Sequence, residues 1–238
     1  MRKKAVCTDP EWTGRADCVH CAIRNRVLFA DLPPDELDDA LIVIDDLVLS
    51  HNRVIYREGE AGNALFTIRR GMVKLVRHLP NGEERIVRLL NVADALGLEA
   101  VIGSSYKHTA IAIGEIEICR IPLEVIRALG LSHPELSIQL MVRWQNALDC
   151  ADRALVEFST GTAEARVARL LLHLCGEGVG ASCPKIGRQD MGSMLGITTE
   201  TASRVIADFK RRGIVGDMEP DGRWHCNQEQ LSSIARQG

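Results

Sequence analysis

The sequence predicts an α+β protein with an N-terminal antiparallel β-roll, a long dimerisation helix and a C-terminal winged helix-turn-helix. Three observations support this fold class. Short apolar stretches punctuated by glycine fill residues 27–128, a pattern typical of antiparallel barrels and rolls. Nearly thirty residues after Ser132 then contain no glycine and one early proline, which favours one long helix. Two shorter helical patterns separated by a glycine follow near the C-terminus.

These changes of pattern divide the chain into four regions. We expect a cysteine-containing arm over residues 1–26 and a β-roll domain over 27–128. A dimerisation helix over 129–160 and a winged helix-turn-helix domain over 161–238 complete the chain.

Composition limits the classes of protein that fit. The 238 residues are 46% hydrophobic and 26% charged, with a net charge of -3, which is ordinary globular composition. This charge excludes a globally basic nucleic-acid binder but not a local DNA-reading face. No apolar run is long enough to span a bilayer, and the N-terminus lacks the apolar core of a signal peptide. We therefore expect a cytoplasmic protein.

Two local signals define elements of the first half of the chain. The Asn81-Gly82 pair between "MVKLVRHL" and "ERIVRLL" predicts a hairpin, because both residues tolerate the positive φ of a tight turn. The segment "PPDELDDALIVI", with proline and aspartate in its first turn, predicts a short helix before the β-roll.

The long helical segment carries an apolar seam. Its members follow alternating steps of three and four residues: Met141, Trp144, Leu148, Ala151, Leu155 and Phe158. Such a heptad pattern favours pairing with a second copy of the chain, although packing on the chain's own sheet is the alternative. We take a homodimer as the working assumption.

The C-terminal region has the signals of a helix-turn-helix. "RQDMGSML" predicts a short helix, Gly196 a tight turn and Thr198 the N-cap of a second helix that ends at Gly213. The stretches "IVGDM" and "GRWHC" after it predict a wing. In this arrangement the second helix enters the major groove of DNA.

One face of the second helix carries groups suited to reading bases. Val205, Ile206 and Phe209 are expected on its buried side, whereas Glu200, Ser203 and Arg204 share another face. Arginine can donate two hydrogen bonds to guanine, and a carboxylate can accept one from the cytosine amino group. A solvated helix with a Glu-to-Arg pair is the alternative.

Eight cysteines in a cytoplasmic chain should stay reduced. Cys18 and Cys21 form a CxxC pair beside His20, whereas four others are expected to be small buried apolar residues: Cys150, Cys175, Cys183 and Cys226. The pair suits an iron-sulfur cluster, structural zinc or a reversible disulfide. Attachment of c-type haem is disfavoured because Ala22, not histidine, follows Cys21.

Residues 28–225 resemble the CRP/FNR family of transcription regulators, with "GITTETASRVIADFKRRGIV" similar to the FNR-type recognition helix. The resemblance implies a homodimer that binds double-stranded DNA, reads TTGAT half-sites in an inverted repeat and works with RNA polymerase. Glu200, Ser203 and Arg204 would contact bases, with Thr199 and Arg188 as further DNA contacts.

The FNR-like branch also implies a cofactor. Its members hold an oxygen-labile [4Fe-4S] cluster through N-terminal cysteines and one distant cysteine. The segment "ICRIPLEVI" resembles the distant one and assigns Cys119, and Cys18 with Cys21 match the N-terminal pair. Val27 stands where the family has its third N-terminal cysteine, so Cys7 is expected to complete the metal ligands.

The alternative is a family member that answers to a small-molecule effector, haem or a thiol switch without a cluster. CRP-type proteins bind cyclic nucleotide through an Arg-Ser pair, where this chain has Lys107, His108 and Thr109. The sequence carries no G-x-S-x-G, HExxH or P-loop pattern. We therefore expect neither cyclic nucleotide binding nor an enzyme.

Overall fold

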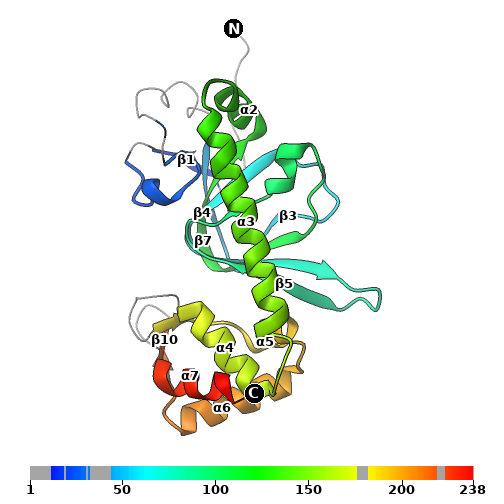
Figure 1. Cartoon of the computed structure of the whole chain (residues 1–238), viewed down its shortest axis with the longest axis vertical. Helices are drawn as coiled ribbons and strands as arrows, with labels where there is room; N and C mark the ends of the chain where they lie inside the picture. Colours follow the sequence, from blue (N-terminus) through cyan, green and yellow to red (C-terminus); the bar gives the residue numbers. More distant parts are fainter. Residues whose placement is uncertain are drawn as a thin grey trace. The chain divides into compact units, whose positions relative to one another are not determined.

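The computed structural model describes residues 12–18, 20–30, 32, 44–175, 182–218 and 223–237 (Figure 1). Cys7 and residues 33–43 of the predicted N-terminal helix lie outside this part. The chain forms two compact units, Met1–Arg77 with Leu89–Leu148, and His78–Arg88 with Asp149–Gly238. Among the described helices, none combines the length and apolar character needed to cross a membrane.

The first unit is built on an antiparallel sheet. Its central strand order is β1-β2-β7-β4-β5, with β3 paired to β7 and β6 paired to β4. The strands are β1 (Trp12–Arg15), β2 (Asp45–Leu49), β3 (Val54–Tyr56), β4 (Ala64–His78), β5 (Glu84–Leu90), β6 (Ala95–Leu96) and β7 (Thr109–Pro122). The glycine-punctuated apolar stretches therefore form the predicted antiparallel roll.

Strands β4 and β7 form the middle of the sheet. They pair over most of their length, with Ile68 opposite Ile118 and Thr67 opposite Cys119. Ile68, Val73 and Ile118 have no exposed surface, so this pair supplies much of the apolar core. On its other side Cys119 pairs with Asp46 of β2. Cys119 is thus held in the sheet interior between two neighbouring strands.

The predicted hairpin at Asn81-Gly82 is confirmed. Gly82 has φ +85°, and the turn closes through hydrogen bonds from Leu79 N to Glu83 O (2.8 Å) and from Gly82 N to Leu79 O (2.9 Å). The Asn81 side chain also contacts Glu83, both accepting from its backbone N–H and donating to its carboxylate.

Part of the N-terminal arm belongs to the sheet. Trp12–Arg15 forms the edge strand β1 and pairs with β2, although the sequence suggests only a flexible arm up to residue 26. The Trp12 Nε1–H donates to Asp45 Oδ1 (3.1 Å), and Arg15 forms an ion pair with the same buried carboxylate. The chain therefore enters the cysteine segment from a fixed point.

The helical region after the roll consists of two helices, α2 (Leu123–Ser132) and α3 (Pro134–Glu157). The break falls at His133, because a residue before proline disfavours the helical backbone conformation. Met141, Leu148 and Leu155 of the predicted seam are 60%, 55% and 69% exposed. Phe158 is different, because it is 2% exposed and packs edge-on against His173.

The second unit is the predicted winged helix-turn-helix. It contains α4 (Ala163–Cys175), α5 (Arg188–Leu195), α6 (Thr199–Arg211) and α7 (Gln228–Arg236). Its three-stranded sheet has the order β8 (Ser182–Pro184), β10 (Arg223–Cys226), β9 (Val215–Met218). The hairpin tip also belongs to this unit, where the Ser193 hydroxyl accepts from Ile86 N and donates to Glu84 O.

Local signals predicted the turn between α5 and α6 correctly. Gly196 ends α5 in the left-handed conformation, with φ +65°. Thr198 caps α6, its hydroxyl accepting from Thr201 N at 3.1 Å. The predicted buried face of α6 needs one correction. Ala202, rather than Val205, lies fully buried with Ile206 and Phe209, because Ala202 is one helical turn before Ile206.

Candidate functional site

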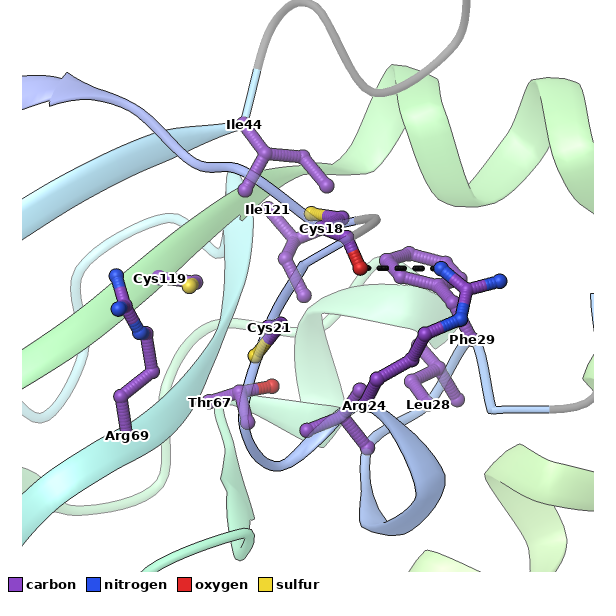
Figure 2. A pocket seen from close by; sticks show the side chains of 11 residues that line it. Cys18, Cys21, Arg24, Leu28, Phe29, Ile44, Thr67, Arg69, Cys119 and Ile121 are labelled. Atoms are coloured by element: carbon purple, nitrogen blue, oxygen red, sulfur yellow. Dashed lines mark hydrogen bonds between the residues drawn. The ribbon is translucent and has the colours of Figure 1, made fainter. Parts of the chain in front are cut away.

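Three of the four predicted metal ligands line one pocket of the first unit. Cys18 and Cys21 come from the segment after β1, and Cys119 from the middle of β7. Figure 2 shows the three sulfur atoms around the same hollow. The other lining residues are Arg24, Val27, Leu28, Phe29, Ile44, Thr67, Arg69 and Ile121. Cysteines about a hundred residues apart are thus brought to one site.

Hydrogen bonds from Arg24 to backbone carbonyl groups hold the cysteine segment in place. Its guanidinium donates to Cys18 O (3.0 Å) and Leu32 O (2.7 Å), and its backbone N–H donates to Cys21 O (3.0 Å). Arg24 also begins the short 3-10 helix η1 (Arg24–Arg26). This single residue therefore fixes the position of both cysteines relative to the turn that follows.

Burial disfavours the thiolate form of two pocket cysteines, Cys18 and Cys119. Burial raises the pKa of Cys18 to about 11, and the neighbouring Cys21 adds to the shift. Burial likewise raises the pKa of Cys119 to about 12, with further contributions from Asp46 and Cys18. A metal centre would displace the thiol protons on binding, because the thiolate is the ligand.

Arg69 places a positive charge beside the same pocket. It forms an ion pair with Asp46, and its charge acts on both Cys18 and Cys119, where it opposes the rise in pKa. In Figure 2 Arg69 and Arg24 flank the group of sulfur atoms. The pocket therefore combines thiol donors with two cations, which suits an anionic thiolate-ligated centre.

The second predicted site is the exposed face of α6. Thr199, Glu200, Ser203 and Arg204 are all exposed. Hydrogen bonds with its own backbone N–H and with Thr198 hold the pKa of Glu200 below its usual value, so the carboxylate is ionised at neutral pH. This face presents an arginine guanidinium, a hydroxyl and a carboxylate on one helix. These are groups that proteins use to read bases.

Arg188, the fifth predicted DNA contact, is half-buried at the start of α5. Its guanidinium lies over the ring of the buried Trp224, 4.9 Å from the ring centroid. This cation–π contact fixes the side chain against the wing. The structure therefore gives Arg188 a packing role within the domain.

Residues 107–109, which stand where CRP-type proteins have their Arg-Ser pair, make hydrogen bonds within the fold. The Thr109 hydroxyl is buried and accepts from Glu58 N (3.1 Å). The backbone N–H of Lys107 donates to Glu99 Oε1 (2.8 Å). No arginine stands at residues 107–109 to meet a phosphate with a fork of donors.

A third site was missed by the sequence analysis. Cys175, Cys183 and Cys226, expected as separate buried residues, have sulfur atoms within 4.8 Å of one another. Their spacings of eight and forty-three positions match no common metal motif, so the sequence holds no usable signal for this cluster.

Comparison with known proteins bears on both units. The family model described as a cyclic nucleotide-binding domain matches residues 47–133, and the Crp-like helix-turn-helix domain matches residues 165–233. The chain belongs to the CRP/FNR family of transcription regulators. It is therefore a DNA-binding regulator and not an enzyme, and regulators of this family act as dimers.

Individual relatives support the same family. The transcriptional activator protein FnrA of Stutzerimonas stutzeri is 26% identical over 220 residues, covering 88% of this chain and 87% of that protein. The transcriptional activator protein anr of Pseudomonas aeruginosa is also 26% identical, covering 84% and 85%. The solved structure of FixK2 from Bradyrhizobium japonicum, 23% identical, matches with a TM-score of 0.72 over 81% of this chain and 97% of that one. This last likeness concerns the CRP/FNR fold alone.

Proposed function

We propose that this CRP/FNR regulator is controlled by an oxygen- or redox-labile [4Fe-4S] cluster held by Cys18, Cys21, Cys119 and Cys7. It acts in the cytoplasm as a homodimer that reads an inverted repeat of TTGAT half-sites and works with RNA polymerase. The observation that carries the proposal is the meeting of Cys18 and Cys21 with Cys119 around one pocket.

The donor set fits a polynuclear centre better than a single ion. Among the described residues, the sulfur atoms of Cys18, Cys21 and Cys119 do not all lie within 4.8 Å of one another. A tetrahedral zinc ion holds its thiolates about 3.8 Å apart, given a Zn–S bond of about 2.3 Å. Thiolates around an iron-sulfur cluster bind different iron atoms and are spread more widely. Arg24 and Arg69 supply positive charge for the anionic centre.

The cysteine segment is connected to the dimerisation helix. Arg143 of α3 donates a hydrogen bond of 2.7 Å to the carbonyl oxygen of Arg26, the last residue of η1. Arg24, at the other end of η1, holds the cysteine segment. A cluster held by Cys18, Cys21 and Cys119 would join this segment to β7. Without it, η1 and the Arg143 contact would be less constrained.

The exposed seam of α3 fits the dimer of this proposal. Met141, Leu148 and Leu155 are large apolar residues that lie on one stripe of α3. Each of them is more than half exposed. Burial of such a stripe against a second copy is favourable because it removes apolar surface from water. Two α6 helices held by the paired α3 helices would then meet half-sites one DNA turn apart.

Anaerobic purification tests the cluster directly. We expect visible absorbance together with iron and sulfide in the wild-type protein, and loss of all three on exposure to air. Cys119→Ser should abolish the absorbance, whereas Cys150→Ser, which changes a cysteine of α3 away from the pocket, should keep it. Wild-type protein that contains neither iron nor sulfide would exclude the cluster and leave a thiol switch or another effector.

The assignment of Cys7 has its own test. Cys7→Ser should lower the cluster content as Cys119→Ser does, because four thiolates are the usual ligand set. Unchanged iron and sulfide in Cys7→Ser would show that another residue is the fourth ligand.

A further inference from the structure

Three buried cysteines of the second unit converge from separate elements. Cys175 ends α4, Cys183 lies in β8 and Cys226 ends β10. Their exposed fractions are 4%, 0% and 0%. All three sulfur atoms lie within 4.8 Å of one another, and those of Cys183 and Cys226 are 3.2 Å apart. This is the only such group of potential metal-ligand side chains in the described part of the chain.

The arrangement is more specific than apolar packing requires. A buried free cysteine behaves as a small hydrophobic residue and has no need to approach another thiol. Here one helix end and two strands each direct a sulfur atom to the same point. Thiolates on a tetrahedral zinc ion lie about 3.8 Å apart, so small side-chain movements bring the three to ligand geometry.

The charge around Cys175, Cys183 and Cys226 suits a bound cation. Three thiolates around a divalent ion leave one net negative charge. Arg223, the first residue of β10, acts electrostatically on both Cys175 and Cys226. Its positive charge offsets the remaining negative charge in an interior that otherwise penalises it.

We propose that Cys175, Cys183 and Cys226 bind one thiophilic divalent cation, of which zinc is the representative. Binding forms three metal–sulfur bonds, and the protons of those thiols that are still protonated are released to solvent. The fourth position takes water or a non-thiol donor, and the Gln228 side chain, which hydrogen-bonds Cys175, is a candidate. The site is separate from the pocket of Cys18, Cys21 and Cys119 and does not depend on the proposed cluster.

A metal at this position would tie α4 to the wing sheet. It would link the last residue of α4 to β8 and β10, which have no disulfide between them among the described cysteines. Since α4 packs against both α5 and α6 within the second unit, metal binding should stabilise the folded DNA-binding domain. Ligands that bind only the folded state raise its stability by mass action.

The test uses full-length protein in which the four proposed cluster ligands are replaced by serine. In a background of Cys7→Ser, Cys18→Ser, Cys21→Ser and Cys119→Ser, we expect one zinc ion per chain after loading with Zn²⁺ and removal of excess. The melting temperature of the second unit should rise on loading. Adding Cys183→Ser should abolish tight zinc binding, whereas adding Cys150→Ser should leave it unchanged. Co²⁺ in place of zinc should give thiolate charge-transfer absorbance.

A second measurement keeps Cys175, Cys183 and Cys226 unchanged, so its result does not depend on whether a variant at this site folds. In the four-serine background, bound Zn²⁺ should protect Cys175, Cys183 and Cys226 from alkylation and leave Cys150 unprotected, as read by peptide mass spectrometry. Absence of both zinc and protection would overturn the proposal. A Cys183–Cys226 disulfide in freshly purified protein would overturn it as well, because oxidised sulfur cannot ligate the ion.

Discussion

Arg143 of α3 donates a hydrogen bond of 2.7 Å to the carbonyl oxygen of Arg26, which lies 117 residues earlier in the chain. Arg26 ends the turn that follows Cys18 and Cys21. The side chain of Arg143 is half-buried, so this contact is a packed connection between the cysteine segment and the helix that carries the exposed seam.

Arg143→Ala should separate cluster binding from dimerisation. The variant should bind iron and sulfide as the wild-type protein does, because Arg143 does not line the pocket. Its dimer fraction should respond less to air exposure than that of the wild type. Analytical ultracentrifugation before and after exposure measures this. Arg153→Ala, an exposed position on the same helix, is the control, and an equal response in Arg143→Ala and wild type would contradict the coupling.

Leu148→Glu should weaken the dimer. Leu148 is 55% exposed on the seam of α3, and a charge there would be buried against the second copy at a cost of several kcal/mol. Asn146→Glu places the same charge on the opposite side of the helix, where it stays in water. We expect sedimentation of cluster-loaded Leu148→Glu as monomer and of Asn146→Glu as wild type. If both variants sediment as monomers, or both as dimers, the seam is not the interface.

Arg204→Ala should relax base recognition at one position of the half-site. The loss of a bidentate arginine–guanine contact costs about 1–3 kcal/mol at the matched base and little at a mismatched one. Fluorescence anisotropy with single-base operator variants measures the difference. Lys210→Ala, near the other end of α6, should alter affinity equally for all variants. A uniform effect of Arg204→Ala would place the arginine on the phosphate backbone instead.

Alkylation of the reduced, metal-free protein should depend on pH through the buried thiols. The thiolate is the reactive species, and Cys18 has its pKa raised to about 11 from 9.0. Its thiolate fraction at pH 8 is therefore about 100-fold lower than in an unperturbed cysteine, since each pKa unit is a factor of ten. Iodoacetamide labelling of Cys18, followed by mass spectrometry, should be slow at pH 8 and rise steadily towards pH 11.

The unfolded chain supplies the reference for this labelling. In denaturant at pH 8, Cys18 should react at the rate of an ordinary thiol, because the burial that raises its pKa is gone. Equal rates in folded and unfolded protein would show that Cys18 is exposed and ionised in solution.

Features set by neighbouring residues were predicted from the sequence. The Asn81-Gly82 hairpin, the Thr198 cap and the turn at Gly196 each depend on the backbone preferences of one or two residues. Most of α3 likewise follows from local periodicity, although the helix predicted over residues 129–160 is divided at His133 and ends at Glu157. The identity of the buried face of α6 was only partly right, because Ala202 and Val205 are both apolar and packing against the rest of the domain decides which one is covered.

Contacts between distant residues were decided by the tertiary structure. The sequence by itself determined the order of the elements and the residue types of the proposed cysteine and DNA-reading sites. It suggested Cys119 only through family resemblance, and the register of β2, β7 and β4 places that residue beside Cys18 and Cys21. The cluster of Cys175, Cys183 and Cys226 arises only when α4, β8 and β10 pack together, because spacing along a chain does not encode distance across a folded core.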